Sequence, residues 1–96
     1  MRVVYHPAVQ RDVNKILKHY ESISGRLGDE FWEELTSRIA ATSQNPGRSH
    51  FSTASLRRSN LRRFPYHFLF RELPEKIRIT VVRHNRRHPD HGVRRR

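Results

Sequence analysis

The chain has 96 residues, 34% of them hydrophobic, no cysteine and a formal net charge of +11 at pH 7. This length accommodates one domain with a modest core and excludes two domains. The lack of cysteine excludes disulfides and thiolate chemistry, and the first residues contain no apolar run that could form a signal peptide or a membrane anchor, so we expect a cytoplasmic protein with no membrane partner.

The first part of the chain predicts a strand followed by a helical hairpin. Residues 2–5 read as a short strand, and Pro7 suits the first position of the helix that follows. Apolar residues three and four positions apart predict helices over 8–23 and 27–40, and the short link at 24–25 predicts that they lie antiparallel. The aromatic residues of the two helices are interpreted as core: Tyr20, Phe31 and Trp32.

The pattern changes to period two in the second part of the chain. Residues 48–54 predict a polar loop, and residues 56–64 predict an extended basic segment. Apolar and polar residues then alternate at 66–71, and again from Ile77 through Ile79 and Val81, which is typical of strands.

These elements predict the order β-α-α-β-β-β, an α+β fold in which a helical hairpin packs on a twisted, mostly antiparallel sheet. Residues 89–96 contain Pro89, Gly92 and a triple arginine, so they predict a mobile basic tail. A single domain over residues 1–88 remains.

The positive charge is concentrated in the C-terminal part of the chain. Residues 57–96 contain thirteen lysines and arginines against three acidic residues, whereas residues 1–56 contain seven against six. Twelve of the thirteen are arginine, whose planar guanidinium binds phosphate or carboxylate bidentately. Codon bias alone would spread arginine evenly, so the distribution favours a basic face for a polyanionic or acidic partner.

Three segments of the chain stand out together: HPAVQRD at the start of the first helix, RRFPYHFLFRE, and VVRHNRRHP at the end of the last strand. They resemble the RelE/ParE superfamily, the toxins of bacterial type II toxin–antitoxin modules. The resemblance covers residues 3–90 in matching order, and the FPY strand and the H-x-R-R ending are closer to the ParE branch.

This resemblance implies one of two activities on one fold. RelE-type toxins cleave mRNA in the ribosomal A site without a metal, ParE-type toxins inhibit DNA gyrase, and an antitoxin neutralises both. We expect a ParE-like growth inhibitor acting on gyrase, in a hetero-oligomer with an acidic cognate antitoxin and without a cofactor. A ribosome-dependent mRNA endonuclease and a non-toxic basic RNA-binding module remain alternatives.

The nuclease alternative requires a general base, a general acid and cations around the phosphate. RelE itself uses lysines beside arginines, but the basic segment of this chain has no lysine. Some relatives use a histidine near the end of the last strand with a tyrosine or a second histidine. His84 takes that place, with Tyr66 and His67 as its possible partners. Because strand side chains alternate, only one of these two can join His84.

The remaining site residues follow from charge and amphipathicity. Arginines on or beside the strands are expected to contact phosphate or the target: Arg57, Arg58, Arg62, Arg63, Arg71, Arg78, Arg83, Arg86 and Arg87. Apolar helix residues are expected to bind the antitoxin as an amphipathic helix or an added strand: Val9, Val13, Leu17 and Leu35. We expect no metal site at His84, His88 and His91, because the segment is irregular and rich in arginine.

Overall fold

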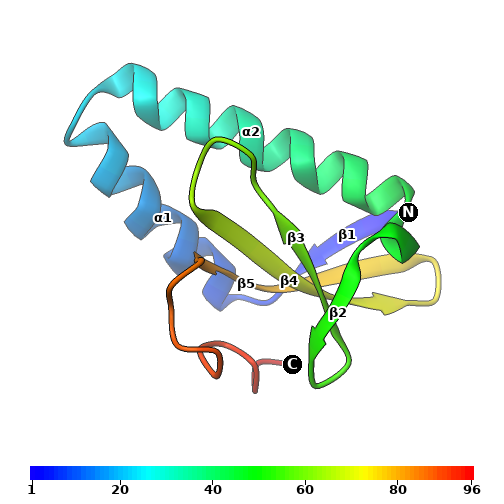
Figure 1. The fold of residues 1–96 in the computed structure, drawn as a ribbon. Helices are drawn as coiled ribbons and strands as arrows, with labels where there is room; N and C mark the ends of the chain where they lie inside the picture. The colour runs from blue at the N-terminus through cyan, green and yellow to red at the C-terminus, as the bar shows by residue number, and fades with distance from the viewer.

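The structure is a computed structural model that describes residues 1–96. Along the chain the elements are β1 (Arg2–Tyr5), α1 (Ala8–Glu21), α2 (Gly25–Gln44), the 3-10 turn η1 (Pro46–Arg48), β2 (His50–Thr53), β3 (Leu56–Asn60), β4 (Tyr66–Leu73) and β5 (Lys76–His84). Figure 1 shows α1 and α2 as a hairpin that packs against a twisted sheet. No helix has both the length and the apolar character needed to cross a membrane.

The five strands form one mixed sheet in the order β1-β5-β4-β3-β2. β1 is parallel to β5, and every other neighbouring pair is antiparallel. The predicted α+β fold, with a helical hairpin on a mostly antiparallel sheet, is therefore confirmed. The expected loop over residues 48–54 was wrong in part, because it contains β2. All four residues of β2 are exposed, so this strand has no alternation of buried and exposed positions by which to recognise it.

The two helices bury the stripes that their spacing predicts. Val9, Val13, Ile16 and Tyr20 of α1 are buried. The Ser24 side chain accepts a hydrogen bond from the Leu27 backbone N–H at 3.0 Å and caps the start of α2.

Two expectations for the helices require correction. Ile23 lies in the link rather than in α1 and is exposed. The side chain of Trp32 is not core, because it is 50% exposed while its neighbour Phe31 is fully buried. Successive side chains on a helix point about 100° apart, so the two cannot both face the sheet.

The sheet buries side chains on both faces. The main cluster of fourteen residues joins the helices to one face and includes Phe68, Phe70 and Ile79. A small cluster of Leu56, Leu69 and Val81 lies on the other face, because neighbouring strand residues point to opposite sides.

A bulge in β5 decides which face its last residues occupy. Leu69 pairs with Val81 while Phe70 pairs with Ile79, so Thr80 is an extra residue without a partner in β4. As a result Val81 leaves the face of Ile79, and strict alternation does not hold across the strand.

The C-terminal tail, for which the sequence predicts mobility, is folded onto the sheet in this structure. Val93 packs on the small cluster of Leu56, Leu69 and Val81. Gly92 has a φ of +78°, and a Cβ at this position would lie 2.7 Å from the side chain of Val81. Glycine therefore permits the close approach of the tail to β5.

Candidate functional site

An apolar groove runs between α1, α2 and the end of β1. It has a volume of about 520 Å³, and eight of its thirteen lining residues are hydrophobic. All four residues predicted to bind an antitoxin lie along it: Val9, Val13, Leu17 and Leu35. Trp32 and Tyr5 also line the groove and are 50% and 48% exposed. Neither aromatic residue was predicted for this site, because the pattern assigns Trp32 to the core and Tyr5 to the end of a strand.

A second hollow, the β5 cleft, lies where β5 ends beside α1. Its volume is about 330 Å³, and its lining combines residues of α1, β4, β5 and the tail. Of the predicted site residues, Tyr66, His84, Arg83 and Arg87 line it. Four more lining residues were not predicted for any site: Arg11, Lys15, His19 and Arg95. His91, considered in the sequence only for a metal site, also lines the cleft.

Tyr66 and His84 lie together in this cleft. They are direct partners in the β4–β5 pairing, and their rings pack edge to face with centroids 5.1 Å apart. His84 Nδ1 accepts a hydrogen bond from the Arg86 backbone N–H at 3.0 Å. The neutral ring therefore carries its proton on Nε2 and offers a donor rather than a base. Burial raises the pKa of the Tyr66 phenol, so this group also stays protonated near neutral pH.

His67 lies on the opposite face of the sheet and is 1% exposed. Its Nε2 accepts a hydrogen bond from Arg83 Nε at 2.9 Å, and its Nδ1 lies 2.9 Å from Asn85 Oδ1. Because the arginine can only donate, Nδ1 carries the proton. Burial lowers the pKa of His67 to about 4, so the ring is neutral near pH 7. The structure thus brings Tyr66 to His84 and separates His67 from both.

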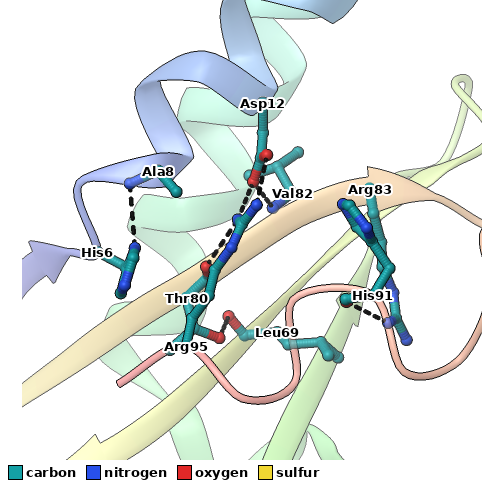
Figure 2. A network of polar contacts seen from close by, with 9 residues as sticks. All are labelled: His6, Ala8, Asp12, Leu69, Thr80, Val82, Arg83, His91 and Arg95. Carbon is teal, nitrogen blue, oxygen red and sulfur yellow. Dashed lines mark hydrogen bonds and ion pairs between the residues drawn. The ribbon is translucent and has the colours of Figure 1, made fainter.

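Arg83 was expected to contact the target, but the structure places it inside the protein. It is 6% exposed. Its Nη1 donates to the backbone oxygen of His91 at 2.8 Å (Figure 2) and to that of Pro89 at 2.9 Å. The guanidinium therefore holds the turn that leads into the tail and is not available to a ligand.

An ion pair fixes the end of the tail to α1. Arg95 Nη1 and Nη2 lie 2.6 and 3.1 Å from the two carboxylate oxygens of Asp12. The same carboxylate accepts the Val82 backbone N–H at 3.1 Å, and Arg95 also donates to the Thr80 backbone oxygen at 3.2 Å (Figure 2). β1 pairs with β5 only as far as Ile79. Asp12 and Arg95 therefore form hydrogen bonds with the backbone groups of β5 that β1 does not reach.

The other predicted arginines do not form one continuous free face. Arg57 lies 3.4 Å from Glu72 and 4.0 Å from the ring centre of Phe51. Arg63 pairs with Glu30 at 2.8 Å. Four further arginines form no ion pair with an acidic side chain within 4 Å: Arg62, Arg71, Arg86 and Arg87.

Two more of the expected residues donate to oxygens that are not on acidic side chains. Arg78 donates to the backbone oxygen of Arg96 at 2.8 Å. Arg58 donates to the side-chain oxygen of Asn60 at 2.7 Å. No group of three or more His, Cys, Asp or Glu residues is arranged to hold a metal ion.

Comparisons with known proteins support the fold. No family model matches this sequence, and no curated protein matches it. Among solved structures, a chain from the "Chromosomal ParDE TA system from P. aeruginosa" superposes with a TM-score of 0.77 at 17% identity, over 88% of this chain and 95% of that chain. The chain therefore has the RelE/ParE-like fold that the sequence resemblance implies.

Proposed function

We propose that this chain is the toxin of a type II toxin–antitoxin pair and that the apolar groove binds its antitoxin. The groove is the observation that carries the proposal, since it lies on a fold shared with a chain of a ParDE toxin–antitoxin system. Two half-exposed aromatic residues, Tyr5 and Trp32, line it, and such exposed apolar surface marks a protein interaction site.

An amphipathic antitoxin helix fits this groove best. Its floor comes from α1 and α2, and its lining includes the amides and hydroxyl of Gln10, Asn14 and Thr36 but no Asp, Glu, Lys or Arg. A helix that binds in a groove contacts it through apolar side chains three and four residues apart. The net charge of +11 also favours an antitoxin with acidic residues beside these anchors.

We propose a ParE-like mode of action in which the toxin inhibits growth by binding DNA gyrase without catalysis. The chemistry of the β5 cleft supports a non-catalytic role. His84 presents a donor, Tyr66 stays protonated, and His67 is buried on the other face. None of the three residues considered for catalysis is placed as a general base.

An mRNA endonuclease is the second candidate, and the β5 cleft is the observation in its favour. Arg11, Lys15 and Arg87 could stabilise a phosphorane there. His91 lines the same cleft, and burial lowers its pKa, so it is neutral near pH 7. A nuclease at this site would use His91 or His19 as its base instead of His67.

Inducible expression in bacteria tests the target. Growth, DNA supercoiling and transcript integrity are followed together for the wild type and for His84→Ala and His91→Ala. Growth arrest with inhibited gyrase and intact messages is the expected result. Cleavage of messages in phase with codons, lost in His91→Ala, would replace the gyrase proposal with the nuclease. Unimpaired growth at high expression would overturn both.

A matched pair of groove variants tests the antitoxin site. Trp32→Glu places a charge in the groove, while Ile23→Glu places the same charge on an exposed residue outside it. We expect both variants to arrest growth, and co-expression of the cognate antitoxin to rescue Ile23→Glu but not Trp32→Glu. Equal rescue of the two variants would show that the antitoxin binds elsewhere.

A further inference from the structure

A polar hollow lies beside β3, away from the groove and the β5 cleft. β2 pairs with β3 only as far as Arg58, so Ser59 and Asn60 have no strand beyond them on that side. The end of α2 and the turn η1 close the space, which has a volume of about 370 Å³. We call it the α2–β3 hollow. It is lined by Arg38, Ala41, Thr42, Asn45, Arg48, Ser49, His50, Arg58, Ser59 and Asn60.

The charge in this hollow is uncompensated. Three arginines and one histidine line it and no acidic residue does. Arg38, Arg48 and Arg58 form no ion pair anywhere in the protein. The C-terminus of α2 contributes a partial negative charge of about half a unit, which is small against three full positive charges.

Asn60 orients two of the three guanidinium groups. Its backbone oxygen accepts a hydrogen bond from Arg38 Nε at 3.2 Å, and its side-chain oxygen accepts one from Arg58 Nε at 2.7 Å. Both contacts use the Nε donor. Arg38 makes no other side-chain hydrogen bond, so its terminal nitrogens remain free to bind a ligand.

Hydroxyl groups lie between these cations. Thr42 and Ser59 share a buried hydrogen bond of 3.0 Å, and both line the hollow. Guanidinium forks together with hydroxyl donors are the groups that bind phosphate oxygens in protein–nucleic acid contacts.

The lining also favours phosphate over an acidic peptide. Ala41 is the only hydrophobic residue in the hollow. Arginine clusters do bind acidic motifs, but most peptides that bind protein surfaces add apolar or aromatic anchors in pockets, and this site offers none. A phosphodiester group needs only charge and donors, which the hollow provides.

We propose that the α2–β3 hollow binds the phosphate backbone of a nucleic acid. It shares no lining residue with the apolar groove, whose residues on α2 are Trp32, Leu35, Thr36 and Ile39. An antitoxin in the groove and a nucleic acid in the hollow can therefore bind at the same time. The proposal does not depend on the toxin function.

The test measures binding of the full chain to two fluorescent probes, a 12-nucleotide single-stranded RNA and a 12-base-pair DNA duplex, between 50 and 200 mM salt. The test variant Arg38→Gln/Arg48→Gln removes two charges from the hollow. The control variant Arg2→Gln/Arg26→Gln removes two exposed charges outside it. Arg38→Lys/Arg48→Lys keeps both charges in place. Thermal melting checks that all variants fold.

Losing two phosphate contacts should lower the slope of log affinity against log salt by about 1.4 for RNA and about 1.8 for DNA, and weaken binding at 0.1 M salt roughly 25-fold for RNA and roughly 60-fold for DNA. The lysine variant should keep most of the slope, and the control should change it by less than about 0.5. The probe with the larger loss identifies RNA or DNA as the ligand. Polyglutamate serves as a third probe for the same variants. Equal losses in test and control variants, no loss in either, or a loss of binding to polyglutamate without a loss for either nucleic acid would overturn the proposal.

Discussion

Breaking the Asp12–Arg95 ion pair should destabilise the whole domain, because it fastens the tail and the open edge of β5 together. The two side chains are 9% and 20% exposed, which lies between a surface pair, worth about 0–1 kcal/mol, and a fully buried pair, whose disruption costs about 3–5 kcal/mol. We expect Asp12→Asn to lower the free energy of unfolding by about 2 kcal/mol. Asparagine can still accept the Val82 backbone N–H through its side-chain oxygen.

A double-mutant cycle separates the ion pair from other effects of the substitutions. Arg95→Gln alone should also cost about 2 kcal/mol, and the double variant should cost only slightly more, which gives a coupling of roughly 1.5 kcal/mol. Arg94, the exposed neighbour of Arg95, provides a control. Arg94→Gln should change the free energy of unfolding by less than about 0.5 kcal/mol.

Urea unfolding followed by circular dichroism provides the free energies. In thermal melts the single variants should lose roughly 8–16 °C, the shift that about 2 kcal/mol produces in a domain of this size. Additivity of the two substitutions within about 0.4 kcal/mol would show that the tail is not held by this contact, and the reasoning would then fail.

Three further outcomes follow from single residues. Stability should fall by about 2 kcal/mol between pH 7 and pH 4.5, because burial holds the pKa of folded His67 at about 4, against about 6.5 in the unfolded chain. The unfolded state then binds more protons, so the contribution is present above about pH 6.5 and lost towards pH 4. Urea unfolding at the two pH values should show a smaller loss in His67→Gln, and an equal loss would contradict the assignment. Gly92→Ala should cost about 1–3 kcal/mol because of its positive φ and its contact with β5. Gly47→Ala, where a Cβ meets nothing within 4 Å, should change thermal stability little. Phe31→Ala should cost about 3–5 kcal/mol and Trp32→Ala less than half as much, a difference that denaturant titration would show.

The sequence predicts the fold well where burial produces a regular pattern. The stripe of Val9, Val13 and Ile16 marks α1 because one face of the helix meets the sheet. β2 gives no such pattern, since it is an edge strand with all four residues exposed.

The candidate site was predicted less well because it depends on details that periodicity does not contain. The bulge at Thr80 exchanges the two faces of β5. It turns Arg83 towards His67 on the side away from the helices and brings His84 beside Tyr66. Strict alternation from Ile77 onward would have placed Arg83 on the face of the helices and His84 on the opposite face. The contribution of the tail was also hidden, because Arg95 finds Asp12 across 83 positions of sequence.

The parallel pairing of β1 with β5 has a consequence for when the protein can fold. Arg2 lies opposite Lys76, so the first strand cannot find its place until the last strand has been made. At translation rates of about 5–20 residues per second, the first strand waits roughly 4–15 s for its partner. During that time α1 lacks β5, the strand it packs against, and the apolar side chains of α1 stay accessible. Such late closure of distant contacts also slows folding in general. We therefore expect refolding from denaturant to be slow for a chain of this length.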